Sequence, residues 1–327
     1  MPVLTVREAL RDALHESMKD ERVFIIGEDI GHYGSTYGVT AGFLEQYGPE
    51  RIRDAPIAEA GILGVAIGAA MTGMRPIAEI MSVNFSLLAL DMIINHAAKI
   101  YSMFGGKFSV PMVMRTTNGW TQLSATHSQS FDALYAHIPG LKVVAPATPA
   151  DMKGMFLAAM ADPDPVIFIE HTLMYGIKGE VPEGNYVVPI GKSTLAREGK
   201  HITVVTYSRM VHLTLEAADI LAKEGIEVEV VDLRTLRPLD MSVALESFKK
   251  TNRAVVVTED WQSYGTSAEI ATRLYEHGFD YLDAPIQRVN FREVPMPYAK
   301  NLEQQVVVTT DRIVAAIRKV LNRSSLQ

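Results

Sequence analysis

The 327-residue sequence contains no cysteine, and this absence removes several kinds of chemistry at once. It excludes disulfides, thiolate zinc sites, iron–sulfur clusters and any cysteine nucleophile. Positive charge is also scarce, because 31 Lys and Arg residues against 38 Asp and Glu residues give a net charge of −7. No basic run could follow a phosphate backbone, so we expect no binding to nucleic acid.

Long hydrophobic runs are missing as well. The longest apolar stretch ends at Arg75, before it reaches the roughly 18 residues that a membrane-spanning helix needs. The first residues are expected to form a short strand or cap and then an amphipathic helix, without the apolar centre of a secretory signal. These features predict a cytoplasmic protein that does not enter a membrane.

Short apolar strands alternate with helical segments along the whole chain. With 48% hydrophobic and 21% charged residues, the chain has the composition of a globular protein and the length for two domains. The alternation predicts two doubly wound α/β domains with mainly parallel sheets. A Gly- and Pro-rich segment at 176–192 is expected to link a first domain, 1–175, to a second, 193–327.

The stretch DAPIAEAGILGVAIGAAMTGMRP, which begins at Asp54, predicts a helix of small and aliphatic residues with one acid, Glu59, near its start. Pro56 suits a first helical turn, with Asp54 or Ala55 as the cap, and the helix should end near Gly73. Glycine lowers helix propensity by up to about 1 kcal/mol relative to alanine. We therefore expect close packing of this helix against a second helix or a second subunit.

Glu59 is a candidate for proton transfer. Burial among apolar residues should raise its pKa, because desolvation disfavours a charged carboxylate, and such an acid can share a proton near neutral pH. The alternative is a solvated acid that complements the positive end of the helix. In the preceding loop, the charges of Glu28 and Asp29 argue against a phosphate site and favour a polar cavity or a solvated turn.

Three further features have both a functional and a structural interpretation. His127 lies in the polar loop TTNGWTQLSATHSQS, where it is either a reactive imidazole or an ordinary exposed histidine. Phe85 could form the wall of a site for a flat ligand or pack in the core. Asp162 and Asp164 lie in an Asp-Pro turn that could hold a cation or be ordinary turn chemistry.

Taken together, the motifs resemble the beta subunits of the decarboxylating first component of 2-oxo acid dehydrogenase complexes, the thiamine-diphosphate family that includes pyruvate dehydrogenase. The resemblance covers nearly the whole chain, in order and at compatible spacing. The matching motifs are GEDIG at 27–31, APIAEAG at 55–61, TGMRPIAEIM at 72–81, HSQS at 127–130, PGLKVVAP at 139–146, VVDLRTLRPLD at 230–240 and VPMPYAK at 294–300.

The resemblance implies a transketolase-like pyrimidine-binding domain followed by a transketolase C-terminal-like domain. It places Glu59 against N1′ of the cofactor's aminopyrimidine ring, where a shared proton prepares the thiazolium carbon to react. It places Ile57, Met81 and Phe85 around that ring, although some relatives have a polar residue where Met81 stands. His127 matches a histidine that helps to pass the acyl unit to a lipoyl group.

The resemblance also implies metal ions and partner chains. In several relatives a potassium ion is held by residues that correspond here to Met112, Ala159, Met160, Asp162 and Asp164. The Gly-Asp-Gly motif that binds the Mg²⁺ of the diphosphate does not occur in this sequence. We therefore expect an alpha subunit to hold Mg²⁺, two alpha and two beta chains to assemble, and the second domain to contribute to the beta–beta contact and to docking on a lipoyl-bearing dihydrolipoyl acyltransferase core.

Several alternatives stay open at this point. The motifs favour pyruvate as substrate, but relatives that act on branched-chain 2-oxo acids or acetoin share them. Transketolase and deoxyxylulose-phosphate synthase carry the diphosphate-binding domain in the same, longer chain, so the length disfavours them. A noncatalytic α/β subunit that assembles or regulates a complex is a further alternative, which the presence of Glu59, Phe85 and His127 disfavours.

Overall fold

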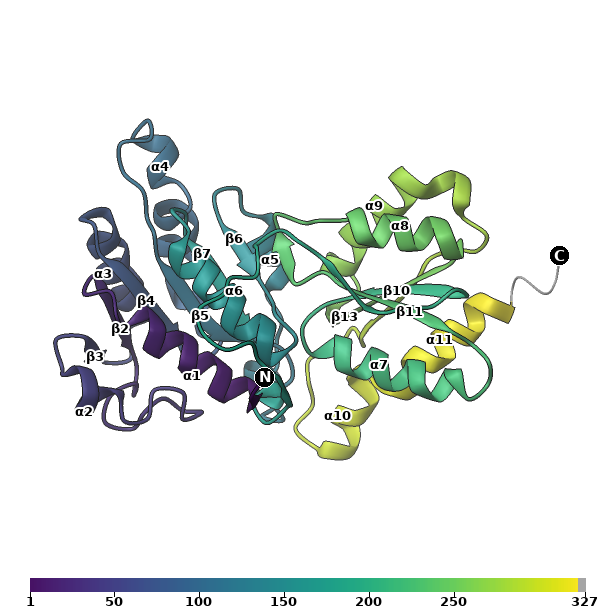
Figure 1. Ribbon diagram of the computed structural model, residues 1–327, viewed down its shortest axis with the longest axis horizontal. Coiled ribbons are helices and arrows are strands. Elements are labelled where there is room, and N and C mark those ends of the chain that lie inside the picture. The colour runs from purple at the N-terminus through teal and green to yellow at the C-terminus, as the bar shows by residue number, and fades with distance from the viewer. Residues whose placement is uncertain (323–327) are drawn as a thin grey trace. The chain divides into compact units, whose positions relative to one another are not determined.

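The computed structural model describes residues 1–322 and divides the chain into two compact units (Figure 1). The first unit contains residues 1–118 and 134–190. The second contains residues 191–322 together with the segment 119–133, which leaves the first unit and returns to it. The predicted domain boundaries divide the chain into consecutive segments. In the structure, residues 119–133 lie between two parts of the first unit in sequence but group with the second unit.

The first unit is built on a parallel sheet whose strands follow the order β6-β7-β5-β4-β2-β3. Every residue of β2, β5 and β7 is buried, as expected for strands covered on both faces. The strands are β2 (Val23–Gly27), β3 (Ile52–Asp54), β4 (Arg75–Ile80), β5 (Val113–Thr117), β6 (Lys142–Val144) and β7 (Val166–Glu170).

The helices of the first unit cover this sheet. Helix α1 begins with a capping box: the N–H of Glu8 donates to Thr5 Oγ1, and the N–H of Thr5 donates to the Glu8 carboxylate. This helix packs against α6 (Figure 1). The helices are α1 (Val6–Ser17), α2 (Phe43–Tyr47), α3 (Glu59–Met71), α4 (Ile100–Met103), α5 (Asp132–His137) and α6 (Pro149–Ala161). Short 3₁₀ turns lie at Ser86–Ala89 and Thr172–Met174 in this unit, and a third, Ala125–His127, lies in the segment that groups with the second unit.

The segment expected as a linker packs on the first unit. Strand β8 (Lys178–Glu180) pairs antiparallel with β1 (Val3–Thr5), and the hydroxyl of Tyr186 donates to the carbonyl of Ala150 at 2.7 Å. A strand pair therefore joins the start of the first unit to the segment that leaves it.

The second unit repeats the α/β arrangement with a sheet of order β14-β13-β10-β11-β9. Its pairs are parallel except for β9, which runs antiparallel to β11. The strands are β9 (Thr194–Arg197), β10 (Ile202–Thr206), β11 (Val228–Asp232), β13 (Ala254–Trp261) and β14 (Gln287–Phe291), and a short strand β12 (Thr235–Arg237) follows β11. The sheets and their alternation with helices confirm the predicted α/β class.

Helices cover both faces of the second sheet. Figure 1 shows α8 with α9 on one face and α7 with α11 on the other, and both pairs are in contact. The helices are α7 (Arg209–Ala222), α8 (Ser242–Thr251), α9 (Thr266–Gly278), α10 (Lys300–Val306) and α11 (Thr310–Asn322), with a 3₁₀ turn at Phe279–Tyr281. Among the described residues, no helix is both long and apolar enough to cross a membrane.

Two expectations about local structure were wrong. The helix at the APIAEAG motif begins at Glu59, with Ala58 as the cap, and not near Pro56. Asp54 is the last residue of β3, and its carboxylate accepts from the backbone N–H groups of Gly31 at 2.6 Å and His32 at 3.1 Å. Asp54 therefore fixes the neighbouring loop instead of capping the helix.

The stretch that begins near residue 81 does not form one continuous helix. The structure has a 3₁₀ turn at Ser86–Ala89, a π-helical segment η2 (Met92–Ala97) and the short helix α4. At the start of this region Asn84 Nδ2 donates to Ser82 Oγ at 2.6 Å, and Ser86 Oγ donates to the carbonyl of Val83 at 2.5 Å. Such local side-chain bonds compete with helical hydrogen bonding, which explains the irregular start.

Candidate functional site

The carboxyl edge of the first sheet gathers the candidate residues of the first unit. Glu28 follows the last residue of β2, and Met81 follows the last residue of β4. Helix α3 begins five residues after β3 ends, so Glu59 starts at the same edge. In open parallel sheets, ligands bind in the crevice outside this edge of the strands.

Glu59 is the first residue of α3 and is only 6% exposed. Within residues 1–322 its carboxylate has no hydrogen-bond or ion-pair partner. Buried polar groups normally have partners, because an unpaired one loses its hydration without compensation. The described residues therefore leave the Glu59 carboxylate available to a ligand at the carboxyl edge.

Glu28 lies close enough to Glu59 for their charges to interact. Burial, and then the carboxylates of Asp29 and Glu59, raise the pKa of Glu28 above its ordinary value. The direction follows from desolvation and like charge, both of which disfavour the ionised form. Glu28 therefore lies in an environment that favours its protonated form.

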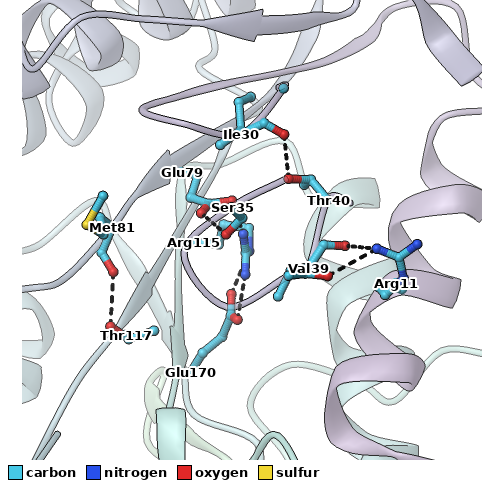
Figure 2. Close-up of polar contacts among 12 residues, drawn as sticks. Arg11, Ile30, Ser35, Val39, Thr40, Glu79, Met81, Arg115, Thr117 and Glu170 are labelled. Carbon is cyan, nitrogen blue, oxygen red and sulfur yellow. Dashed lines mark hydrogen bonds and ion pairs between the residues drawn. The ribbon is translucent and has the colours of Figure 1, made fainter. Parts of the chain in front are cut away.

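Met81 and Phe85 lie on elements that contact α3. Helix α3 packs against β4 and against the 3₁₀ turn that Phe85 precedes, and the side chains of Met81 and Phe85 are both half-buried. Thr117 Oγ1 donates to the carbonyl of Met81 at 3.1 Å, which fixes the backbone where β4 ends (Figure 2). Ile57 differs, since 75% of it is exposed.

A buried ion network lies one to three residues before this edge, and our sequence analysis missed it. Arg115 on β5 donates through Nε and Nη2 to the two carboxylate oxygens of Glu170 on β7, at 2.7 Å each, and through Nη1 to Glu79 on β4 (Figure 2). All three residues are at least 94% buried. Tyr175 donates to Glu170 Oε2 at 2.6 Å. The sequence signal that could have revealed this network is a charged residue inside a predicted buried strand, as at Glu79, Arg115 and Glu170.

The same network holds the loop that carries Glu28. Ser35 Oγ donates to Glu79 Oε1 at 2.5 Å, and Thr40 Oγ1 donates to the carbonyl of Ile30 at 2.6 Å (Figure 2). A Cβ atom at Gly31 would lie 2.6 Å from the Asp54 carboxylate, so a larger residue there would displace the side chain that accepts from Gly31 and His32. The loop is thus fixed at both ends, as expected for a segment that shapes a site.

His127 belongs to the second unit. It ends the 3₁₀ turn Ala125–His127, is half-buried, and its Nδ1 lies 3.1 Å from Thr126 Oγ1. Its carbonyl accepts from Thr121 Oγ1 at 2.5 Å. The structure places Glu59, Met81 and Phe85 on or beside contacting elements of the first unit, whereas His127 belongs to the second unit.

The residues expected to hold a potassium ion lie at the end of α6 and beside it, but side-chain cations already contact them. Arg75 Nη1 donates to the carbonyls of Met160 at 2.6 Å and Asp162 at 3.2 Å. Lys142 Nζ lies 2.6 Å from Asp162 Oδ1 and 3.2 Å from Asp164 Oδ2. Although burial opposes it, the bonds to these two carboxylates raise the pKa of Lys142 above its ordinary value.

The remaining carbonyls of this set also accept hydrogen bonds. The carbonyl of Met112 accepts from the N–H of Val166 at 3.0 Å, and the carbonyl of Ala159 accepts from the N–H of Asp162 at 3.2 Å. The arrangement suits the two protein cations better than a potassium ion, which stays a prediction. No cluster of three or more His, Asp or Glu residues within residues 1–322 could hold another metal ion.

The outer face of α3 is open. Gly61, Val65 and Gly68 are exposed, and a side chain built at Gly68 would meet no atom within 4 Å. A groove of about 650 Å³ begins beside this face, lined in part by His32, Pro56 and Gly61. The close packing expected for these glycines is therefore not supplied by residues 1–322.

Comparisons with known proteins agree with this geometry. Residues 3–178 match the family described as "Transketolase, pyrimidine binding domain", and residues 191–313 match "Transketolase, C-terminal domain". The chain is 48% identical to "Pyruvate dehydrogenase E1 component subunit beta-2, mitochondrial" of Oryza sativa subsp. japonica, over 98% of this chain and 87% of the rice protein.

Two further relatives extend the comparison. The chain is 47% identical to "Pyruvate dehydrogenase E1 component subunit beta" of Rickettsia felis, over 97% of this chain and 98% of that protein. Among solved structures, a protein described as "Split gene transketolase, inactive beta4 tetramer" superimposes with a TM-score of 0.80 at 26% identity, over 98% of each chain. Both likenesses span the two units, so the family assignment does not depend on a single motif.

Proposed function

The chain belongs to the family of pyruvate dehydrogenase E1 component beta subunits, and from that membership we propose that it forms the aminopyrimidine side of a thiamine diphosphate site completed by an alpha subunit. The assembled enzyme catalyses thiamine-dependent oxidative decarboxylation of a 2-oxo acid, pyruvate being the favoured substrate. The observation that supports our assignment of the site is Glu59, a residue only 6% exposed whose carboxylate has no partner among residues 1–322.

The residues at the sheet edge fit the proposed cofactor. When bound, thiamine diphosphate supplies the electron sink that decarboxylation requires. Glu59, which is only 6% exposed, would hold a proton at N1′ of the aminopyrimidine ring. Ile57, Met81 and Phe85 would line the ring's binding site. Glu28, whose pKa is raised in part by the Glu59 carboxylate, lies beside the same position.

The alpha subunit supplies what this chain lacks. The sequence has no Gly-Asp-Gly motif, so we assign Mg²⁺ and the diphosphate to the alpha chain. The open Gly61–Gly68 face of α3, with exposed Val65 at its centre, suits a closely packed neighbour at the subunit interface. The solved relative described as an inactive β4 tetramer supports the same division of labour.

The wider assembly is part of the proposal. We propose two alpha and two beta chains, and transfer of the acyl group to a lipoyl-bearing dihydrolipoyl acyltransferase core that docks on the second unit. Exposed aromatic residues there, Tyr264 at 97% and Tyr298 at 85%, suit a protein contact. The cytoplasmic location stays a prediction, because the rice relative is described as mitochondrial; imaging of a tagged chain tests it.

Reconstitution tests the proposal. We expect the beta chain alone neither to decarboxylate pyruvate or branched-chain 2-oxo acids nor to cleave acetoin at a measurable rate. After co-expression with its alpha chain, and with thiamine diphosphate and Mg²⁺, we expect decarboxylation with the highest kcat/KM for pyruvate. Turnover by the isolated chain would contradict the division of the site. A higher kcat/KM for another substrate would replace pyruvate and leave the site unchanged.

A further inference from the structure

The loop that carries His127 leaves the first sheet and packs within the second unit. Residues 119–133 follow the end of β5 but group with residues 191–322. Within this segment Trp120, Ser128, Ser130 and Asp132 are buried, whereas Gln122 and Leu123 near the tip are exposed. The loop thus has anchored ends and an accessible tip close to His127.

The backbone of this loop is in a costly conformation. Gln122 and Ser124 have φ angles of 66° and 74°, and Ser124 combines its φ with a ψ of −168°, a region that is essentially restricted to glycine. Such residues cost about 1–3 kcal/mol each and persist only where surrounding contacts determine the conformation. Contacts outside the tip must therefore hold it.

One anchor is made by Arg209 at the start of α7. Its guanidinium lies over the ring of Trp120, 5.4 Å from the ring centroid, and its Nη1 donates to Glu259 Oε1 at 2.8 Å. Ser130 Oγ donates to the backbone carbonyl of the same Glu259 at 2.6 Å. Glu259 of β13 therefore contacts Ser130 directly and is linked to Trp120 through Arg209.

The second anchor is made by Tyr207, which follows β10. Its hydroxyl donates to Asp132 Oδ2 at 2.6 Å and lies 2.7 Å from Thr266 Oγ1. Thr266 in turn donates through its hydroxyl and its N–H to Asp260 Oδ2, at 2.7 and 2.6 Å. Every member of this chain of contacts is at least 93% buried, so water does not compete with it.

Tyr207 stays a hydrogen-bond donor over the working range of the enzyme. Burial, and then the nearby carboxylates of Asp132 and Asp260, raise the pKa of Tyr207 well above its ordinary value. A bond from a hydroxyl to a buried carboxylate is of the strong, charge-assisted kind. Loss of the hydroxyl would leave the Asp132 carboxylate short of one donor.

We propose that Tyr207 and Arg209 are positioning residues, through which the second unit holds the His127 loop in the conformation required for acyl transfer. This proposal rests on the proposed role of His127. The second domain thus contributes to the reaction itself, in addition to any part it has in assembly.

The first test uses Tyr207→Phe in the reconstituted complex with its alpha chain. Two rates are compared: reductive acylation of a free lipoyl domain, and decarboxylation coupled to an artificial electron acceptor. We expect the ratio of the first rate to the second to fall about 10-fold or more, because a displacement of about 1 Å can cost about 100-fold in rate. In the His127→Ala background, Tyr207→Phe should cause no further fall.

Thr203→Val is the matched control. Thr203 lies on β10 in the same unit, is fully buried, and has two hydroxyl partners at 2.6 and 2.7 Å, Ser247 and Thr251. Its network resembles that of Tyr207 but touches no residue of 119–133. We expect Thr203→Val to leave the ratio of rates at its wild-type value. An equal fall in both variants would show a general effect of a buried hydroxyl and would overturn the proposal.

Hydrogen exchange gives a second measurement that needs no catalysis. In Tyr207→Phe, amides of peptides that span 119–133 should exchange faster than in the wild type, and in Thr203→Val they should not. Unchanged exchange in Tyr207→Phe would overturn the proposal. It would also be overturned if His127→Ala lowers the ratio of rates and Tyr207→Phe leaves that ratio unchanged. If His127→Ala itself leaves the ratio unchanged, the role of His127 fails, and faster exchange in Tyr207→Phe would still show that the loop is held by Tyr207.

Discussion

Arg115 and Glu170 form a two-bond ion pair inside the first sheet, with Nε and Nη2 of the arginine each 2.7 Å from a carboxylate oxygen (Figure 2). Their side chains are 3% and 0% exposed. The strands β5 and β7 are neighbours, and the register places Arg115 opposite Phe168, two residues before Glu170. The pair therefore joins adjacent strands just below the edge where the candidate site lies.

Removal of this arginine should destabilise the fold. Arg115→Met leaves the buried carboxylates of Glu79 and Glu170 without their cation, and breaking a buried pair in this way costs about 3–5 kcal/mol. Arg22→Met is the control, because Arg22 pairs with Asp20 at the surface, where such pairs contribute about 0–1 kcal/mol. Chemical denaturation of both variants measures the difference. Equal, small losses would show that the network contributes little to stability.

The loss in Arg115→Met should depend on pH. Burial, opposed by Arg115 and Ser35, raises the pKa of Glu79 in the wild type, and without Arg115 it should rise further. A carboxyl whose pKa is higher in the folded than in the unfolded state binds protons on folding, so its folded form gains stability as pH falls through that pKa. The variant should therefore lose less stability, relative to the wild type, at pH 5 than at pH 8. A loss that is constant with pH would contradict this.

Glu59→Gln should remove turnover and leave the fold intact. An amide cannot relay the proton, and general acid–base groups contribute about 10²–10⁴-fold to rate. We expect a fall of that size in steady-state decarboxylation by the reconstituted complex, with an unchanged melting temperature. Glu50→Gln is the matched control, since the Glu50 side chain is 90% exposed. Near-normal rates in Glu59→Gln would remove Glu59 from the mechanism.

His127→Ala should affect the transfer of the acyl group more than decarboxylation. We expect reductive acylation of a lipoyl domain to fall by about 100-fold, while the rate with an artificial electron acceptor changes by less than about threefold. His277→Ala, an exposed histidine of α9, should leave both rates unchanged. Equal losses in the two assays would show that His127 acts before transfer.

Asp240→Asn should weaken the second unit at neutral pH but not in acid. Burial opposes ionisation, but hydrogen bonds from Ser193 and Ser242 lower the pKa of Asp240 from 3.8 to about 2. A carboxyl with a lowered folded pKa stabilises the protein above pH 3.8, and this stability is lost as pH falls toward 2. Solvent screening reduces the expected difference to about 1 kcal/mol at pH 7. It should shrink by pH 3 in denaturation curves, and a difference that persists would contradict the prediction.

The sequence alone predicted the elements of both sheets because local patterns specify them. The apolar runs near Val23, Val166 and Ile202 form buried parallel strands in the structure. Their alternation with helices along the chain predicted a doubly wound sheet. Glu59 was found in the same way, since one acid beside a run of small residues is visible in the sequence itself. The sequence did not predict the role of Asp54. Its carboxylate accepts from the backbone N–H groups of Gly31 and His32, which lie more than 20 residues before it in the chain.

Sequence thus determined the α/β class, the beta-subunit family and the candidate acid, because periodicity and motifs are properties of neighbouring residues. Tertiary structure alone decided which distant groups meet. Arg115 reaches Glu170 across 55 residues, and Tyr207 reaches Asp132 across 75 residues. Folding alone decides such pairs, because each side chain by itself is compatible with many environments and only the packing of strands and loops selects one. For that reason the loop of His127 was predicted as an isolated polar segment, whereas the structure shows that buried residues of the second unit hold it.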